Sequence, residues 1–273
     1  MSEGIEAGRR SGRTAGSWRA PRARAWAFYF AHRPAIVLGM GLYLVAVHLL
    51  ALHLLLAYSP WPGIAAAELG LTSRWVEFDR YHQNRAGLLA RHARALAPGA
   101  ALFVGDSLLA ALDAGALADH AAQLSVAGDT ARGTAARMRH YAQALREARV
   151  VVLHVGTNDL RYRPPEALRP YYDRILAAVP AGVPVVVTDV LPVDEGAFRE
   201  YGNAQVRAAN RVLAQACATR PGCRSAATAA GLTDANGGLD PRLHVGDGVH
   251  LNADGYRAWL AALAPALAPW RSF

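Results

Sequence analysis

The amino-acid sequence predicts a three-layer α/β/α domain of the flavodoxin-like type with a parallel sheet, preceded by a single transmembrane helix. Two observations support this fold class. From Gly99 onward, short apolar runs alternate with helical stretches, and such alternation is typical of parallel strands joined by right-handed helical crossovers. Ahead of this region lies a run of 24 residues without a formal charge, 35–58, which as a helix is long enough to cross a bilayer.

The predicted domain covers residues 99–273. Helical stretches separate its apolar runs, which we expect to be strands. If the strand order is 2-1-3-4-5, the first strand lies between the second and the third, and the loops at their carboxyl ends meet at one crevice. The expected strands are Ala101–Val104, Gln123–Ala127, Val150–Val155 and Val183–Leu191, and the expected helices are 108–119, 131–148, 166–178, 199–218 and Ala253–Leu263.

The uncharged run 35–58 is expected to be an uncleaved signal anchor, about 36 Å long as a helix. The preceding tail, 1–34, holds seven arginines and two glutamates, whereas Arg74 is the only arginine in the 20 residues after the run. This asymmetry predicts a single-pass protein of the inner (cytoplasmic) membrane with a disordered cytoplasmic tail and a periplasmic, or otherwise extracytoplasmic, domain. The alternative is a cleaved signal peptide, although the apolar core of such a peptide usually spans only about 7–15 residues.

Residues 59–98 are expected to be a membrane-proximal connector. It contains a polar helical stretch around Phe78–Leu96 that is rich in arginine and histidine. A helix that faces solvent or lipid headgroups explains this composition.

The formal net charge of +8 does not indicate a nucleic-acid-binding protein. All 29 basic residues are arginines, and the tail 1–34 carries a net +5, which leaves +3 for the other 239 residues. A nucleic-acid-binding domain would carry its charge on a folded face. Two cysteines are too few for a four-cysteine zinc site, and the ten histidines form no ligand-spaced cluster with them. We therefore expect no nucleic-acid partner, no metal and no cofactor.

Four polar clusters are candidates for a functional site. Three of them stand where a predicted strand ends, and the fourth stands just before the last predicted helix. Because the carboxyl ends of parallel strands share one edge of a sheet, the first three would converge although more than 20 residues separate them in sequence. The clusters are Gly105-Asp106-Ser107, Gly128-Asp129-Thr130, Gly156-Thr157-Asn158-Asp159 and Asp247-Gly248-Val249-His250-Leu251-Asn252.

Together and in this order, the clusters resemble the four blocks of the SGNH (also called GDSL) hydrolase superfamily. Ser107 matches the serine of the first block, Gly128 the glycine of the second and Asn158 the asparagine of the third. Asp247 and His250 match the Asp-x-x-His of the last block. The sequence around Gly128 is similar to the arylesterase/lysophospholipase branch, and the wider pattern also resembles the platelet-activating-factor acetylhydrolase-like branch.

The resemblance implies a serine hydrolase that works through an acyl-serine intermediate. Ser107 would be the nucleophile, His250 the base that removes its proton, and Asp247 the carboxylate that orients the imidazole. The resemblance also implies an oxyanion hole made of the backbone N–H groups of Ser107 and Gly128 and the side-chain amide of Asn158.

Each site residue also has a purely structural interpretation. Ser107 and Asp106 are suited to capping the helix that follows them, and we expect Asp106 to be structural. Asn158 and Asp159 are also typical of an Asx turn. His250 could simply open the last helix. Only the four clusters in combination favour catalysis.

Two further features bear on the motifs. His244 lies three residues before Asp247, on the wrong side for the Asp-x-x-His motif, so we expect it to be a loop residue. The G-x-S-x-G elbow of α/β-hydrolases is not met, because Leu109 stands at its last glycine position. The flavodoxin-like layout is therefore favoured over the α/β-hydrolase fold.

Cys217 and Cys223 are the two cysteines of the chain, and they flank an Arg-Pro-Gly turn that is expected after a helix. Outside the cytoplasm, a disulfide across this short loop is expected, with a modest stabilising effect. The alternative is a pair of buried thiols.

The function expected from the sequence is that of an extracytoplasmic serine esterase acting on short-chain O-acyl esters. The alternatives are an O-acetyltransferase acting on envelope polysaccharide, a lysophospholipase or thioesterase, and a non-catalytic glycan-binding scaffold. The substrate would be an acyl ester of a small molecule, a lipid or a glycan, and 35–58 would hold the protein in the membrane. The loop 160–172 could line the crevice, with Arg161 and Arg163 meeting an anionic substrate; the alternative is a solvated loop.

Overall fold

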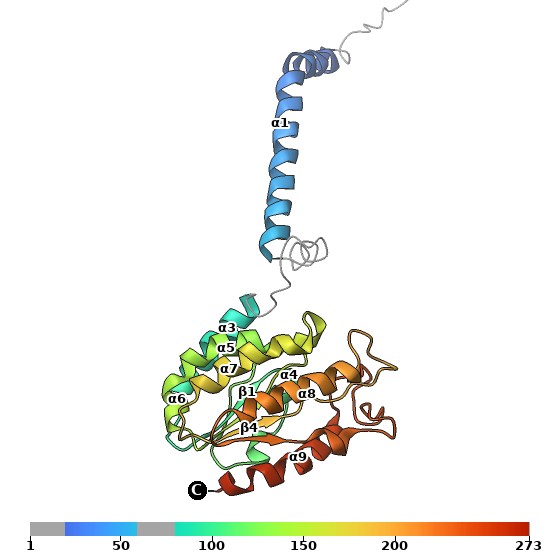
Figure 1. Ribbon diagram of the computed structural model, residues 1–273. Coiled ribbons are helices and arrows are strands. Elements are labelled where there is room, and N and C mark those ends of the chain that lie inside the picture. The colour runs from blue at the N-terminus through green and yellow to red at the C-terminus, as the bar shows by residue number, and fades with distance from the viewer. Residues whose placement is uncertain (1–19, 59–79, 273) are drawn as a thin grey trace, which may run out of the picture. The chain divides into compact units, whose positions relative to one another are not determined.

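The computed structural model describes residues 20–58 and 80–272, and the chain divides into two compact units, 1–73 and 74–273. The first unit contains helix α1 (Ala20–Tyr58; Figure 1). Within α1, Phe30–Leu54 has a mean hydropathy of 2.3 and is long and apolar enough to cross a membrane. A signal sequence near the N-terminus has the same length and apolar composition. α1 is therefore a candidate for either a membrane span or a signal sequence.

Helix α1 starts earlier than the predicted anchor. Residues 20–34 of the tail are helical, not disordered as expected, while 1–19 lie outside the described residues. The sequence accounts for this start, because Pro21 stands in the first turn, where a missing N–H is tolerated, and alanines and arginines favour a helix. Pro34 lies inside the helix, where it removes a backbone hydrogen bond, and Figure 1 shows a bend in the N-terminal part of α1.

The second unit is built on a five-stranded sheet in which all paired strands are parallel, in the order β2-β1-β3-β4-β5. The predicted fold class and strand order are therefore confirmed. The strands are β1 (Ala101–Gly105), β2 (Ala121–Gln123), β3 (Val150–His154), β4 (Val185–Thr188) and β5 (Cys223–Ala226).

Two strands differ from the sequence-based expectation. β2 ends at Gln123, where the predicted strand begins, yet the chain beyond it stays bonded to β1, with Leu124 N donating to Phe103 O at 2.7 Å. β5 is absent from the predicted strands because its own residues do not form an apolar run. It is a short edge strand whose two central residues are exposed.

Helices cover both faces of the sheet (Figure 1). On one face, α3, α5, α6, α7 and α8 contribute to one hydrophobic cluster, and on the other face α4 and α9 contribute to a second. Their bounds are α3 Arg80–Arg94, α4 Ser107–Ala110, α5 Ala131–Arg137, α6 Ala142–Glu147, α7 Arg169–Ala178, α8 Asn203–Ala218 and α9 Ala253–Leu267. Short 3-10 turns lie at Ala114–Ala116, Met138–Tyr141, Asp159–Arg161, Pro165–Leu168, Ala229–Leu232 and Ala268–Trp270.

The central strands β1 and β3 are buried along their whole length. Along β1, Leu102 and Val104 join the first cluster, whereas Ala101 and Phe103 join the second. This is the two-residue period of a strand with both faces covered. Truncation of a buried leucine such as Leu102 to alanine would cost about 2–5 kcal/mol, so the sheet is a rigid support for the loops at its carboxyl ends.

Helix α3 belongs to the folded domain. The polar helix expected around 78–96 is present, but Leu89 and Ala93 on it are buried in the first cluster. The predicted boundary at residue 99 is thus too late, and α3 is not a freely solvated connector. Its exposed arginines gave the sequence a polar appearance although one face of the helix is packed.

Candidate active site

The candidate site residues lie at the carboxyl ends of the strands and in the loop before α9. Ser107 begins α4 directly after β1, Gly128 lies in the loop after β2, and Asn158 lies in the loop after β3. Since β1 pairs with both β2 and β3, these loops are neighbours. The loop before α9 brings Asp247 and His250 to the same edge.

Ser107, His250 and Asp247 form one chain of hydrogen bonds. The Oγ of Ser107 lies 3.1 Å from Nε2 of His250. The Nδ1 of His250 lies 2.6 Å from Oδ2 of Asp247. Because the Asp247 carboxylate can only accept, Nδ1 carries the hydrogen, and Nε2 is left free to accept the Ser107 proton.

The loop itself fixes the Asp247 carboxylate. Its Oδ1 accepts the backbone N–H groups of Val249 at 3.0 Å and His250 at 2.9 Å. Desolvation raises the pKa of Asp247, but these bonds and the His250 imidazole outweigh it and hold the pKa below its ordinary value. Asp247 is therefore ionised at neutral pH. The side chains of Asp247 and His250 are 45% and 44% exposed, so this end of the hydrogen-bond chain is open to water.

A second aspartate–histidine pair is formed by Asp106, the residue before Ser107, and His154, and both residues are fully buried. Asp106 caps α4, since its Oδ1 accepts the N–H of Leu108 at 3.1 Å, and it lies 3.8 Å from His154 Nε2. Burial raises the pKa of Asp106 to about 8 and lowers the pKa of His154 to about 3. Both groups are therefore uncharged near pH 7, so their contact is not an ion pair, and it is the cap bond from the Leu108 N–H to Asp106 that fixes the start of α4.

Two of the three predicted oxyanion residues, Gly128 and Asn158, are brought together by the loops after β2 and β3. Gly128 has a φ of +77°, a backbone conformation that favours glycine. The side-chain amide of Asn158 donates to the backbone carbonyl of Asp129, the residue that follows Gly128, at 3.0 Å. An asparagine amide carries two hydrogens, so one fixes the side chain against the Gly128 loop and the second is available to a substrate oxygen.

Asp159 ties the Asn158 loop to the start of α5. Its Oδ2 accepts the N–H of Ala131 at 2.7 Å, and its Oδ1 accepts from Arg163 at 2.6 Å. Burial raises the pKa of Asp159 to about 7. The Asx turn expected from the sequence is in this respect a link between two loops.

Two supports of the Gly128 loop have no signal in the sequence. Asp129 accepts from the buried Arg137, with a 2.9 Å bond from Nε and a second from Nη2, and Arg137 Nη1 also donates to Tyr141 Oη at 2.7 Å. His82 of α3 is buried against the same loop, since a Cβ on Gly128 would lie 3.5 Å from its Nε2. Both residues belong to stretches whose arginines and histidines look solvated in sequence.

The two loop arginines that could meet an anionic substrate have carboxylate partners within the protein. Arg163 pairs with Asp159, and Arg161 Nε lies 3.2 Å from a carboxylate oxygen of Glu200. The guanidinium of Arg161 also lies over the ring of Phe198. These partners favour a structural role over an anion subsite.

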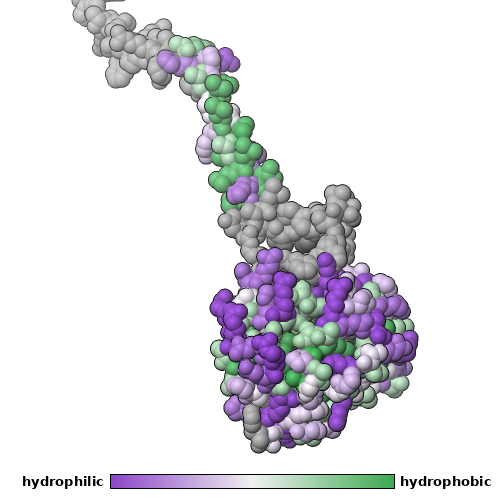
Figure 2. All heavy atoms as spheres, turned by 60° about the vertical axis from the view of Figure 1, so that its left-hand side comes forward, coloured by the Kyte–Doolittle hydropathy of each residue, from purple (hydrophilic) through white to green (hydrophobic). Residues whose placement is uncertain are grey.

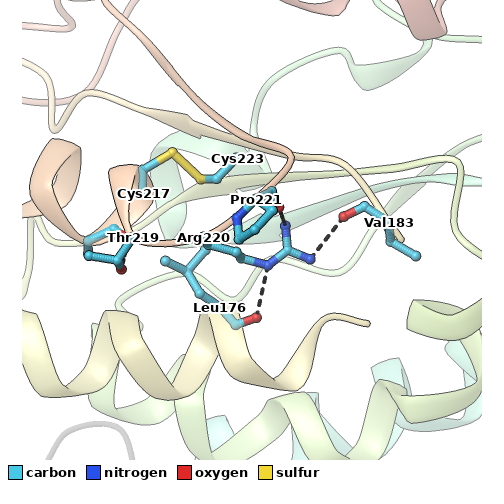
Figure 3. Close-up of a disulfide and its surroundings, with 8 residues drawn as sticks. Leu176, Val183, Cys217, Thr219, Arg220, Pro221 and Cys223 are labelled. Carbon is cyan, nitrogen blue, oxygen red and sulfur yellow. Dashed lines mark hydrogen bonds between the residues drawn. A yellow bond between two sulfur atoms is a disulfide. The ribbon is translucent and has the colours of Figure 1, made fainter. Parts of the chain in front are cut away.

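Cys217 and Cys223 form a disulfide with an S–S distance of 2.07 Å (Figure 3). The bridge joins the end of α8 to the start of β5. It therefore lies at the amino end of this strand, whereas the candidate site lies at the carboxyl ends of the strands. Between the two cysteines, Arg220 donates to carbonyl oxygens of the α7–β4 connection, at 2.8 Å for Pro180 and 2.9 Å for Val183. The bridged loop thus anchors that connection. Within residues 20–58 and 80–272, no group of three His, Cys, Asp or Glu side chains is arranged to hold a metal ion.

Comparison with known proteins gives one family match and several structural matches. The model of the GDSL-like lipase/acylhydrolase family matches residues 103–258. A Streptococcus pneumoniae structure whose title refers to platelet activating factor has a TM-score of 0.64 and 18% identity, covering 74% of this chain and 99% of that one. A GDSL-like lipase from Bacteroides thetaiotaomicron has a TM-score of 0.50 and 22% identity, with coverages of 67% and 97%.

The catalytic domain of a peptidoglycan O-acetyltransferase from Streptococcus pneumoniae has a TM-score of 0.51 and 20% identity, covering 63% of this chain and 94% of that one. At these identities the structural matches show a shared fold. The comparison with curated proteins gave no match.

Proposed function

This chain belongs to the GDSL-like lipase/acylhydrolase family, and from that premise we propose that it is a serine esterase with Ser107 as the nucleophile. The observation that carries the proposal is the unbroken hydrogen-bond chain from Ser107 Oγ through His250 to Asp247. A serine hydroxyl needs a base within hydrogen-bond reach to become nucleophilic, and His250 meets that condition.

In the first half-reaction, Ser107 Oγ attacks the ester carbonyl carbon while its proton passes to His250 Nε2. The imidazolium that forms is stabilised by the ionised Asp247. When the tetrahedral intermediate collapses, the bond to the alcohol oxygen breaks, and that oxygen takes the proton from His250. In the second half-reaction, His250 removes a proton from water, which attacks the acyl-serine. The bond between the acyl carbon and Ser107 Oγ then breaks, Oγ takes the proton back from His250, and the carboxylic acid is released.

The charge that develops on the carbonyl oxygen would be held by the backbone N–H groups of Ser107 and Gly128 and by the free hydrogen of the Asn158 amide. The positive φ of Gly128 and the bond from Asn158 to Asp129 support this role. Such preplaced donors stabilise the transition state without reorganisation during the reaction.

Water access supports hydrolysis of a short acyl group as the outcome. Nearly half of the His250 side chain is exposed, so water can reach the base in the acyl-enzyme. A long acyl chain would require an enclosed apolar channel, and an open triad fits a short O-acyl group better. The second candidate is O-acetyl transfer to a polysaccharide, which the shared fold of the peptidoglycan O-acetyltransferase domain favours.

We also propose that α1 anchors the enzyme in the inner membrane with the catalytic domain outside the cytoplasm. The apolar segment of α1 and the arginines that precede it support this topology. A disulfide between Cys217 and Cys223 suits an oxidising compartment. Reporter fusions to the C-terminus test the topology. Activity from a fused reporter that works only in the cytoplasm would contradict it.

The test of the chemistry is a panel of p-nitrophenyl esters from acetyl to long chain, assayed with and without glycan acceptors. We expect turnover that is fastest for short chains, independent of the acceptor, and abolished in Ser107→Ala. Turnover that requires the glycan would identify a transferase instead. Turnover retained by a folded Ser107→Ala variant would remove the nucleophile assignment.

A further inference from the structure

The imidazole ring of His244, a residue expected from the sequence to be an ordinary loop residue, makes three hydrogen bonds, and the residue is only 8% exposed. Its Nδ1 lies 3.0 Å from the backbone nitrogen of Gly246 and 3.1 Å from that of Gly248. Its Nε2 lies 3.1 Å from Oδ2 of Asp194. A backbone N–H can only donate, so Nδ1 is the acceptor and Nε2 carries the hydrogen that Asp194 receives.

The two glycines bonded to His244 stand on either side of Asp247. Both have positive φ angles, +106° for Gly246 and +78° for Gly248. A turn with two such residues has no regular ladder to satisfy its N–H groups, and the His244 ring supplies the acceptor for both. The ring therefore fixes the backbone from which the Asp247 carboxylate projects.

The same turn also carries His250. His244 and Leu251 form an antiparallel bridge, and Val245 N donates to His250 O at 2.9 Å. His250, the proposed base, thus lies on the segment that returns from this turn. It is hydrogen-bonded to the segment that carries His244. A shift of this turn would change the position of Asp247 and His250 together.

Asp194, in the segment after β4, holds the turn from outside. Its backbone N–H donates to Gly248 O at 2.9 Å, and its Oδ1 accepts from Gly196 N at 2.8 Å. A Cβ at Gly248 would lie only 2.9 Å from the Asp194 carbonyl oxygen. The hydrogen bond from Gly196, and after it the contact with His244, hold the pKa of Asp194 below its ordinary value. Asp194 is therefore ionised and suited to fixing the tautomer of His244.

From this geometry we propose that His244 is a positioning residue of the hydrolase, which acts as the acceptor that holds Asp247 and His250 in register with Ser107. It touches neither substrate nor reacting atoms. The proposal deepens the proposed function and rests on it, since register with Ser107 matters only if these residues catalyse.

Two substitutions separate the acceptor role of His244 from its contact with Asp194. In His244→Asn, the side-chain oxygen can replace Nδ1 as the acceptor for the two glycine N–H groups, while the bond to Asp194 is lost. In His244→Gln, the longer amide can still donate to Asp194, but the glycine N–H groups lose their acceptor. Arg242→Gln is the matched control, because Arg242 lies in the same loop and its side chain is 86% exposed.

We expect His244→Gln to lower kcat by about 10- to 100-fold, the effect of leaving buried donors unpaired, with KM within about twofold. His244→Asn should stay within about threefold of the wild type, and Arg242→Gln should be unchanged. Circular dichroism melting checks that each variant is folded. Equal kcat in His244→Gln and the wild type, or equal losses in His244→Gln and His244→Asn, would overturn the proposal.

A second measurement does not depend on catalysis. Proton NMR of the Ser107→Ala protein reports the low-field Nδ1–H of His250, which Asp247 accepts. This resonance should persist when His244→Asn is added and should vanish when His244→Gln is added. If the resonance follows this pattern but the wild type hydrolyses no ester, the proposed function fails, and what stands is only that His244 holds Asp247 and His250 in hydrogen-bond contact. If the resonance is indifferent to both changes, the positioning role fails by itself.

Discussion

Two aspartate–histidine pairs lie near Ser107, and they differ in nearly everything except residue type. Asp106 and His154 are fully buried, 3.8 Å apart, with the pKa of each shifted toward its neutral form. Asp247 and His250 are half-exposed, 2.6 Å apart, and hydrogen bonds keep the carboxylate ionised. Burial thus keeps the first pair uncharged, whereas exposure leaves the second pair open to proton exchange with water.

The largest expected effect separates the two histidines. His250→Ala should lower kcat by about 10⁴- to 10⁶-fold, the range for triads that lose a member, with little change in melting temperature. His154→Ala should instead lower the free energy of unfolding by about 2–4 kcal/mol, because it leaves a cavity and removes the buried hydrogen bond between His154 Nδ1 and the Thr188 hydroxyl. Ester hydrolysis and urea titration measure the two quantities. A variant of His154 that is folded but inactive would break the comparison.

A smaller effect is expected from the oxyanion donor. Asn158→Ala should lower kcat by about 10²- to 10³-fold, the usual loss for one such donor. The bond from Asn158 to Asp129 is also lost, so the variant should be compared with Asn158→Asp, which keeps the shape and removes the donor. Steady-state kinetics of both variants checks this, and a rate near that of the wild type in either would contradict the oxyanion role.

The disulfide should affect stability alone. Cys217 and Cys223 close a loop of sequence separation 6, for which chain entropy predicts a contribution of about 2 kcal/mol. The double variant Cys217→Ala/Cys223→Ala should therefore unfold at lower urea concentration while its kcat stays near that of the wild type. If the folded double variant also lost kcat, the result would contradict this prediction and show that the disulfide affects the candidate site.

The last prediction concerns pH and the buried carboxyl. The pKa of Asp106 rises from 3.8 in the unfolded chain to about 8 in the folded one. Between these values only the folded state holds the proton, so its contribution to stability is complete below pH 3.8 and is lost as the pH rises through about 8. The slope is about 1.4 kcal/mol per pH unit. Urea titrations of wild type and Asp106→Asn from pH 4 to 9 should diverge by this slope, and parallel curves would contradict the burial effect.

Much of the fold and of the candidate site could be predicted because both follow local rules. The apolar runs at β1, β3 and β4 are fully buried strands, and the polar clusters after β1 and β3 mark the carboxyl edge of a parallel sheet. The combination of Ser107, Asn158 and His250 therefore pointed to one crevice, and the structure brings Ser107 and His250 into hydrogen-bond contact.

The remaining features depend on contacts that sequence patterns do not encode. β5 has no apolar run, because an edge strand need not be buried on both faces. Arg137 and His82 look like solvated residues, yet both support the Gly128 loop from buried positions. His244 has the wrong spacing for the family motif, and its importance appears only when the loop with Asp194 is seen beside it.

The hydrogen bond from Ser107 to His250 joins positions that are 143 residues apart in the chain. Because a chain is synthesised from its N-terminus, Ser107 is made long before His250. A fragment that ends before residue 250 would keep the proposed nucleophile without the histidine proposed to activate it, and we expect such a fragment to be inert toward esters.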